Sequence, residues 1–223
     1  MRAEFTPEIQ GNLRRHRISI PLSIGQVGGI RIFGRLIRSL VFSTDVAIIR
    51  NCNADAVIAV YPFTPQPAIT HAIMQAADTP VFCGVGGGTT TGTRVVNLAQ
   101  DAEHQGALGV VVNAPTENET IYRIRETLDI PIVVTVASDK TDFAARIAAG
   151  ATIFNVSCAA DTPRVVDAIR QKFPDFPIIA TGGATEESIL RTIDAGANAI
   201  TYTPPSTGEI FRDMMIRYRQ LEG

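Results

Sequence analysis

The chain has 223 residues, of which 45% are hydrophobic and 19% charged, so the composition is that of a globular protein and not of a disordered one. A formal net charge of −2 excludes a strongly basic nucleic-acid binder. No apolar run approaches the roughly 18 residues of a membrane span, and we expect no membrane partner. The small share of charged residues favours a homo-oligomer that buries part of its surface.

Three cysteines are spread along the chain, at Cys52, Cys83 and Cys158. Their odd number and wide spacing fit neither a disulfide framework nor a paired-cysteine metal site. The N-terminus has no apolar segment of the kind found in secretory signals. We therefore expect a cytoplasmic protein.

Residues 1–37 precede the first strand and form an N-terminal extension. Thr6 is placed to cap a short helix at Pro7–Arg15, and alternation around Gly28–Gly29 predicts a β-hairpin. We expect the extension to pack on the domain that follows, residues 38–223. There it either closes one end of that domain or contacts another copy. The alternative is a loop that reaches the functional site.

Eight short apolar runs follow at starts about 23 residues apart, the length of one β/α unit. Because each run is almost continuously apolar, it indicates a parallel strand that is buried on both faces. The predicted strands are Ser39–Ser43, Ala56–Tyr61, Val81–Val85, Gly109–Asn113, Ile132–Val136, Thr152–Val156, Ile178–Thr181 and Ala199–Tyr202.

The segments between these runs have helical periodicity, as at Val95, Leu98, Ala99 and Ala102. Eight β/α units without a break in composition predict a single (β/α)8 TIM barrel, with the helix and hairpin as an extension. An open doubly wound sheet is the alternative. We disfavour it because no GxGxxG motif follows the first strand.

In such a barrel, functional groups come from the loops at the carboxyl ends of the strands. The loops after strands seven and three are rich in glycine and suit a bound anion, because they bring backbone N–H groups close to it. Whether the anion lies at the strand 7–8 loops or at the strand 3 loop stays open. The predicted substrate-binding residues are Thr181, Gly182, Gly183, Thr203, Ser206, Gly87, Gly88, Arg94, Asn113 and Asn155.

The segment PIIATGGATEESILRTIDAGANAITYTPPS, residues 177–206, resembles the last third of the phosphate-binding barrels of the ribulose-phosphate-binding type. That group includes ketodeoxyphosphogluconate aldolase, N-acetylmannosamine-6-phosphate epimerase and thiamine-phosphate synthase. The resemblance implies a phosphate held by the loops after strands seven and eight. The chain departs from the pattern at Pro204 and Pro205, which have no N–H to offer a phosphate.

Four residues in the strand-end loops are candidates for acid–base chemistry, namely Lys140, Asp139, Asp45 and Glu117. Asp139 beside Lys140 is the most suggestive pair, although Asp45 also suits a helix cap. A Schiff-base aldolase of this type uses a lysine on strand six, where this chain reads TIFNVSCAAD. Lys140 is therefore expected to clamp substrate or transfer a proton, and not to form an adduct.

We predict no protein-held metal and no cofactor. The histidines, His16, His71 and His104, fall outside the strand-end loops. Mg²⁺ held by Asp45 or Asp139 together with substrate oxygens remains an alternative.

The favoured function is an enzyme, an isomerase, epimerase or lyase that acts by acid–base chemistry on a small phosphorylated or carboxylated metabolite. The predicted partner is thus a small anionic molecule. A non-catalytic ligand-binding or regulatory barrel is the first alternative, and a metal-dependent hydrolase is the second.

Overall fold

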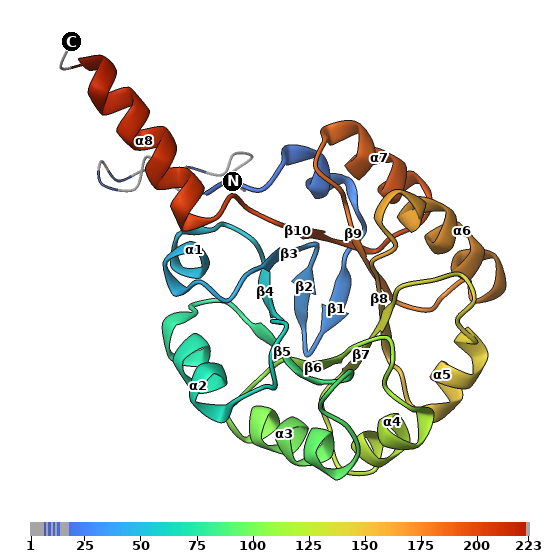
Figure 1. The fold of residues 1–223 in the computed structure, drawn as a ribbon. Coiled ribbons are helices and arrows are strands. Elements are labelled where there is room, and N and C mark those ends of the chain that lie inside the picture. Colours follow the sequence, from blue (N-terminus) through green and yellow to red (C-terminus); the bar gives the residue numbers. More distant parts are fainter. Residues whose placement is uncertain (1–6, 8, 10, 12, 14–17, 222–223) are drawn as a thin grey trace, which may run out of the picture.

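A computed structural model describes residues 7, 9, 11, 13 and 18–221. Eight parallel strands close into a barrel in the order β10-β3-β4-β5-β6-β7-β8-β9, with helices outside them (Figure 1). Each strand pairs with its neighbours in sequence, and the last strand pairs with the first. The predicted TIM barrel is confirmed.

The eight barrel strands begin and end within two residues of the predicted runs. Their central residues are almost all buried, as expected for strands covered on both faces. They are β3 (Ser39–Phe42), β4 (Ala56–Ala59), β5 (Val81–Gly86), β6 (Gly109–Val112), β7 (Ile132–Val136), β8 (Ile153–Val156), β9 (Ile178–Thr181) and β10 (Ala199–Tyr202).

Helices alternate with these strands along the chain. Several begin at a residue whose side chain accepts a backbone N–H of the first turn, such as Asp45 before α1 and Asp142 before α5. The helices are α1 (Val46–Asn51), α2 (Pro67–Ala76), α3 (Thr93–His104), α4 (Asn118–Arg125), α5 (Phe143–Ala149), α6 (Thr162–Lys172), α7 (Glu186–Asp194) and α8 (Thr207–Leu221).

The apolar core has two layers, one between the strands and the helices and one inside the barrel. Leu40, Phe82, Val111 and Ile179 belong to the inner layer. Gly109 makes room there, because a Cβ at that position would lie 2.8 Å from the Phe82 ring. The interior is therefore filled by side chains and is not an open pore.

The N-terminal hairpin closes one end of the barrel. Its strands are β1 (Ile30–Ile32) and β2 (Arg35–Ile37), and its buried isoleucines pack against the inner layer (Figure 1). Since β2 leads directly into the start of β3, the hairpin lies at the amino ends of the barrel strands. It cannot reach the loops at their carboxyl ends.

The turn of the hairpin differs from the prediction. It lies at Phe33–Gly34 and not at Gly28–Gly29, because both Phe33 and Gly34 adopt positive φ, at 46° and 82°. Such angles match the tight turns that join paired strands. Gly29 instead donates its N–H to the Asn198 carbonyl, which ties the hairpin to the barrel. The predicted helix at Pro7–Arg15 lies mainly outside the described residues.

Residues 18–27 cover the gap between α7 and α1. Ile18 exchanges backbone hydrogen bonds with Asn51 and Asn53 at the end of α1, and the 3-10 helix Leu22–Gln26 packs against α7. Ile24 is completely buried there. In other barrels the eighth helix usually covers this gap between the seventh and first helices. In this chain α8 projects away from the barrel (Figure 1). No helix in the described part of the chain is long and apolar enough to span a membrane.

Candidate functional site

A layer of side chains lines the inside of the barrel at the carboxyl ends of its strands. Side chains alternate along a strand, so this layer is found two residues beyond the inner core on each strand. On β3, β4 and β5 the positions are apolar, and on β6 to β10 they are amides and hydroxyls. The layer, hereafter the mouth layer, is Phe42, Val60, Gly84, Asn113, Thr135, Asn155, Thr181 and Thr201.

Two oxygen atoms of the mouth layer are buried without a hydrogen-bond partner among the described residues. They are Asn155 Oδ1 and Thr201 Oγ1. Asn155 uses its amide nitrogen to donate to Thr135 Oγ1 at 3.4 Å. Buried polar atoms are nearly always satisfied by protein, water or ligand. A water molecule or a polar ligand group within reach of these two atoms would complete their hydrogen bonding.

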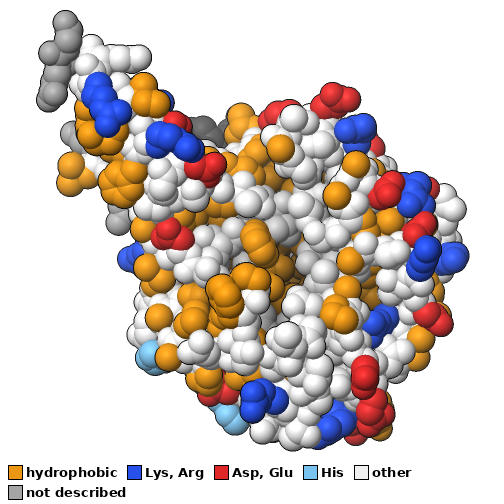
Figure 2. Space-filling view, in the orientation of Figure 1, with side chains coloured by type: hydrophobic (Ala, Val, Ile, Leu, Met, Phe, Trp, Pro, Cys, Tyr) orange, Lys and Arg blue, Asp and Glu red, His pale blue; other side chains and the backbone are white. Residues whose placement is uncertain are grey.

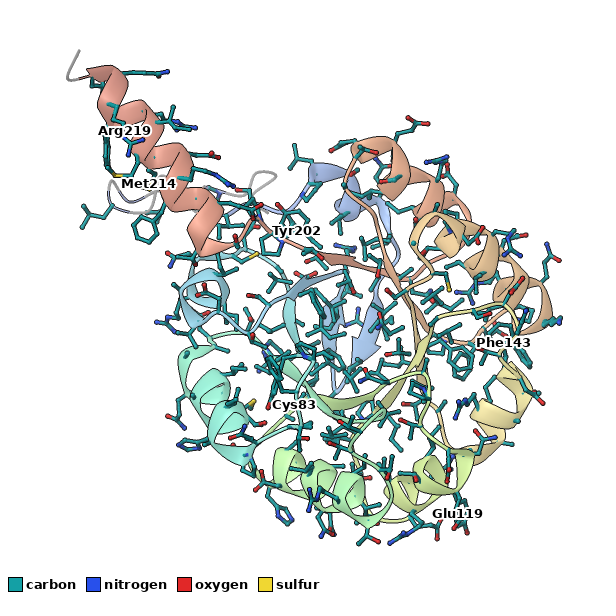
Figure 3. All side chains as sticks on the ribbon, in the orientation of Figure 1. Cys83, Glu119, Phe143, Tyr202, Met214 and Arg219 are labelled. Atoms are coloured by element: carbon teal, nitrogen blue, oxygen red, sulfur yellow. The ribbon has the colours of Figure 1, made fainter. Side chains whose placement is uncertain are left out.

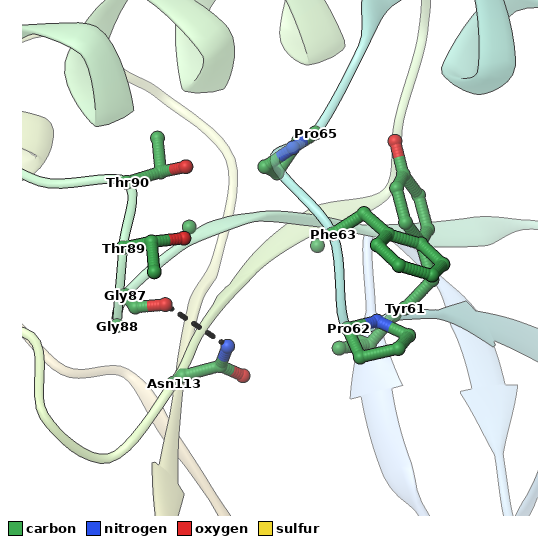
Figure 4. Close-up of a pocket in the computed structure, with 12 residues that line it drawn as sticks. Tyr61, Pro62, Phe63, Pro65, Gly87, Gly88, Thr89, Thr90 and Asn113 are labelled. Carbon is green, nitrogen blue, oxygen red and sulfur yellow. Dashed lines mark hydrogen bonds between the residues drawn. The ribbon is translucent and has the colours of Figure 1, made fainter.

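Two hollows open above the apolar half of the layer. One, of about 250 Å³, lies between the Tyr61–Pro65 loop after β4 and the glycine-rich loop after β5 (Figure 4). The other, of about 530 Å³, lies between the loops after β3, β4 and β10. Asn113 lines both, and its Nδ2 donates to the Gly87 carbonyl at 3.3 Å. The predicted residue Asn113 thus stands where the hollows meet.

The loop after β5 approaches its neighbours too closely for any side chain at Gly87. A Cβ there would lie 2.4 Å from Thr116 Oγ1, itself buried without a partner, and 2.8 Å from Asn113 Cβ. Gly87 and Gly88 have φ of 99° and 90°, which glycine adopts without strain. Both predicted glycines line the first hollow, whereas Arg94 is exposed on α3 and lines neither.

Asp45 is the only charged side chain among the described residues that line these two hollows. Its Oδ1 accepts the N–H groups of Ala47 and Ile48, and its Oδ2 accepts the hydroxyl of Thr207 at the start of α8. The Thr207 hydrogen bond is the main reason that the pKa of Asp45 lies below its ordinary value. The carboxylate is therefore ionised at neutral pH, and it caps α1 as the sequence allowed.

The other predicted catalytic residues lie away from these hollows. Asp139 turns toward Arg164 on α6, at 2.8 Å, and this guanidinium lowers the pKa of Asp139. Lys140 and Glu117 line a third hollow of about 470 Å³ between the loops after β6 and β7. The structure thus brings Lys140 and Glu117 together, but it turns Asp139 away from that hollow.

Gly182 and Gly183 pack tightly at the start of α7. A Cβ on Gly182 would meet Ile200 and Ile189, and one on Gly183 would lie 2.5 Å from Ser188 Oγ. Ser188 and Thr185 cap α7 reciprocally, so two N–H groups of this helix end are already satisfied. Glu186 and Glu187 add negative charge to the first turn. These contacts weigh against an anion here, although Gly182 and Gly183 stay predicted binding residues.

The loop after β10 contributes Thr203 and Ser206 to the second hollow. Ser206 also donates its N–H and its hydroxyl to the Glu209 carboxylate, which lowers the pKa of Glu209. The Thr203 hydroxyl, by contrast, makes no hydrogen bond to another side chain among the described residues. Thr203 is therefore the better placed of the two to meet a ligand.

Metal and thiol chemistry find little support within the described residues. No group of three or more histidine, cysteine, aspartate or glutamate side chains is arranged to hold a metal there. Asp45 and Asp139 lie after β3 and β7, on opposite sides of the barrel. Burial raises the pKa of the Cys158 thiol, and the thiol donates to the Val136 carbonyl, so Cys158 is not poised as a thiolate.

Sequence reasoning missed three polar residues at or beside the mouth layer, namely Thr135, Thr201 and Tyr61. Thr135 and Thr201 alternate with buried apolar residues on β7 and β10, and the period of two would have placed them beside Thr181. Tyr61 lines both hollows and accepts the Gln66 N–H at its hydroxyl, at 2.8 Å. The sequence signal for Tyr61 was its position at the end of the apolar run Ala56–Tyr61, next to a strand-end loop.

The sequence matches no protein family and no curated protein that it was compared with. Solved structures do match the fold. A phosphonopyruvate hydrolase in complex with oxalate and Mg²⁺ is 12% identical, with a TM-score of 0.62 and 83% of each chain covered. 2,3-Dimethylmalate lyase, a member of the PEP mutase/isocitrate lyase superfamily, is 11% identical, with a TM-score of 0.61, 90% of this chain covered and 81% of the other.

A monomeric dihydrodipicolinate synthase variant is 20% identical, with a TM-score of 0.55, 74% of this chain covered and 68% of the other. At these identities the likeness establishes the barrel fold alone. It corrects the expected resemblance to the ribulose-phosphate-binding barrels, since the structures named here come from other barrel groups. The expectation was based on the TGG turn at residues 181–183 and the AGA junction at residues 195–197. In this structure the first packs against the capped start of α7 and the second follows its end.

Proposed function

We propose that the chain is a barrel enzyme of the acid–base type, an isomerase or lyase, that acts on a small carboxylated metabolite bearing a hydroxyl or oxo group. The observation that carries the proposal is the pair of unpartnered oxygens in the mouth layer. Asn155 Oδ1 only accepts a hydrogen bond, whereas the Thr201 hydroxyl also donates one. A ligand hydroxyl suits the first, and a carboxylate or carbonyl oxygen suits the second.

The surroundings of the mouth fit the same class of ligand. The two hollows meet at Asn113 and are lined mainly by neutral groups, with the Asp45 carboxylate at the edge of the second. An ionised Asp45 can accept a proton from a bound hydroxyl or a carbon acid. Similar folds support the ligand class, because the phosphonopyruvate hydrolase structure holds oxalate, a small carboxylate.

Thr201→Val tests the ligand part of the proposal. The substitution conserves shape and removes a buried hydroxyl that has no protein partner, so the free protein becomes more stable by about 1 kcal/mol. Binding of the matching hydroxy or oxo acid weakens at least tenfold. The measurement is thermal unfolding with a panel of hydroxy acids, oxo acids and phosphonates. Unchanged affinity in a stabilised variant would contradict the proposal.

Asp45→Asn tests the chemistry. Asparagine caps a helix about as well as aspartate, so the fold is retained while the carboxylate base is lost. We expect turnover to fall by a factor of about 10² to 10⁴ with ligand affinity little changed. Lys140→Met is the comparison, because Lys140 lies in the third hollow. If only Lys140→Met loses turnover, the reaction belongs to the hollow of Lys140 and Glu117.

A non-catalytic ligand-binding barrel is the second candidate. It is favoured by the hydrogen bonds that engage both carboxylate oxygens of Asp45 and by the neutral character of the other described lining residues. The same ligand would then bind without conversion. Incubation of the ligand with the protein, followed by mass spectrometry and NMR of the small molecule, separates the two functions.

A further inference from the structure

Beyond its first turn, where Ile210 packs against the barrel core, the C-terminal helix α8 carries an exposed apolar face. None of its residues is buried, and Phe211 and Leu221 are 61% and 83% exposed. At about 100° per residue, five of the six exposed large apolar side chains of α8 fall within about 120° of the helix circumference, and Ile216 lies on the opposite side. We call these five residues the α8 face: Phe211, Met214, Met215, Tyr218 and Leu221.

The barrel does not need α8 as a cover. Residues 18–27 already bury the seam between α7 and α1, with Ile24 and Val27 packed in the outer core. Beyond its first turn the helix therefore projects from the barrel, and hydrophobic side chains gather along it (Figure 2). Met214 and Arg219 lie on this projection, away from the barrel body (Figure 3). An apolar face of this extent on an exposed helix marks an interaction surface.

We propose that the α8 face pairs with the α8 face of a second copy of this chain, in antiparallel orientation about a two-fold axis. A two-fold contact uses the same surface on both subunits and closes at a dimer. The inference is independent of the proposed function, because it uses none of the mouth residues.

The charges that flank the face select the antiparallel orientation. Asp213 and Arg217 lie on one edge of the face, and Arg219 lies on the other. In an antiparallel pair centred near Met215, Asp213 of each helix stands opposite Arg217 of the partner subunit, which gives two attractive pairs. A parallel pair brings the two opposite edges together, and Arg217 then faces a second arginine. Like charges across such a contact oppose that arrangement.

The position of α8 favours the same orientation. An antiparallel pair places the two barrels at opposite ends of the paired helices, whereas a parallel pair crowds both barrels at one end. The C-terminal end of the second helix then meets the hollow of about 380 Å³ at the base of α8. That hollow is lined by Pro205, Ile210, Asp213, Met214, Arg217 and Tyr218. Pro205 also lines the second hollow of the mouth, so the dimer contact reaches the edge of the site.

The nature of the face argues against an acidic lipid surface as the partner. Within Thr207–Leu221 three arginines are offset by Glu209 and Asp213, so the helix is not strongly basic. Helices that bind such surfaces have polar faces rich in lysine and arginine. The mixed charges instead suit a protein partner whose edge presents both signs, as a second α8 does.

The test measures the molar mass of the full chain by sedimentation over micromolar concentrations. The wild type is expected to be a dimer, and Met214→Glu is expected to weaken it at least a hundredfold, since it places a carboxylate in each half of the apolar contact. Ile216→Glu is the matched control on the opposite side of the helix and should stay dimeric. Thermal unfolding confirms that both variants keep the fold.

Charge reversal tests the orientation. Asp213→Arg and Arg217→Asp should each weaken the dimer about tenfold, and the double variant should restore it. A wild type that is monomeric throughout would overturn the proposal and leave the face to residues 1–17 or to a membrane. A dimer that survives Met214→Glu would also overturn it. Failure of the double variant to recover affinity would exclude the antiparallel pairing.

Discussion

At the scale of single residues, the glycines of the loop after β5 show how close approach shapes the mouth. Gly87 and Gly88 share a positive φ, but only Gly87 faces neighbours within van der Waals distance. Alanine at Gly88 therefore tests the cost of backbone strain alone, whereas alanine at Gly87 adds a steric clash. Comparison of the two variants shows how much the close packing of the first hollow matters.

Gly87→Ala should cost about 2–4 kcal/mol of stability and weaken ligand binding, because its Cβ displaces Thr116 and Asn113 as well as straining the backbone. Gly88→Ala carries only the backbone cost of about 1 kcal/mol, since nothing lies within 4 Å of its Cβ. Chemical unfolding of both variants checks the difference. Equal losses would show that the contact with Thr116 relaxes freely.

The contribution of Asp45 to the stability of the protein depends on pH. Its folded-state pKa lies below the ordinary 3.8, so its ionised form contributes stability that is present above that value and is lost as pH falls through the folded pKa. The stability difference between wild type and Asp45→Asn should therefore be constant from pH 7 to about pH 5 and should shrink below pH 3.8. Urea unfolding across this range measures it. A difference that stays constant to pH 3 would contradict the lowered pKa.

At the scale of elements, the hairpin β1–β2 closes the amino end of the barrel as a plug. The backbone of its turn is strained at Phe33, and a substitution there can relieve the strain. Phe33 adopts φ of 46° and is 67% exposed, so its ring contributes little while its backbone is strained. Phe33→Asn should stabilise the protein by about 0.5–1 kcal/mol, because asparagine followed by glycine favours such turns.

Ile37→Ala, at a completely packed position of the plug, should cost about 2–4 kcal/mol of stability. Thermal unfolding of both variants tests the role of the hairpin.

The elements also show how far sequence reasoning reaches. Continuous apolar runs identified all eight barrel strands, because burial on both faces leaves a strong and simple signal. The turn of the hairpin was misplaced, since Gly28–Gly29 resembles a turn while Phe33 is an unusual residue at positive φ. Asn113 and Asn155 were predicted as binding residues from their strand ends, and the structure places both at the carboxyl ends of barrel strands. The direction of Asp139, toward Arg164, depends on a contact 25 residues away that no local pattern encodes.

At the scale of the whole molecule, the α8 face and the barrel separate cleanly. Removal of residues 207–223 deletes the projecting helix, and among the described residues it takes one partly buried apolar side chain, Ile210, from the core. The truncated chain should therefore keep its barrel and lose about 1–3 kcal/mol of stability, from the Ile210 contact and the Asp45–Thr207 hydrogen bond. Calorimetry of the truncated chain as a monomer measures this. A larger loss would show that more of α8 than its first turn packs on the barrel.

The pairing of β10 with β3 sets the order in which a newly synthesised chain completes its fold. β3 emerges early from the ribosome, yet one of its edges has no neighbour until residues 199–202 have been made. The plug isoleucines and the inner faces of seven strands cannot complete their packing before β10 is made. A chain halted just before β10 presents two bare sheet edges, and such edges invite aggregation. The four residues of β10 pair with β3 on one side and β9 on the other, so this one short strand removes both bare edges at once and converts an open, aggregation-prone sheet into a closed barrel.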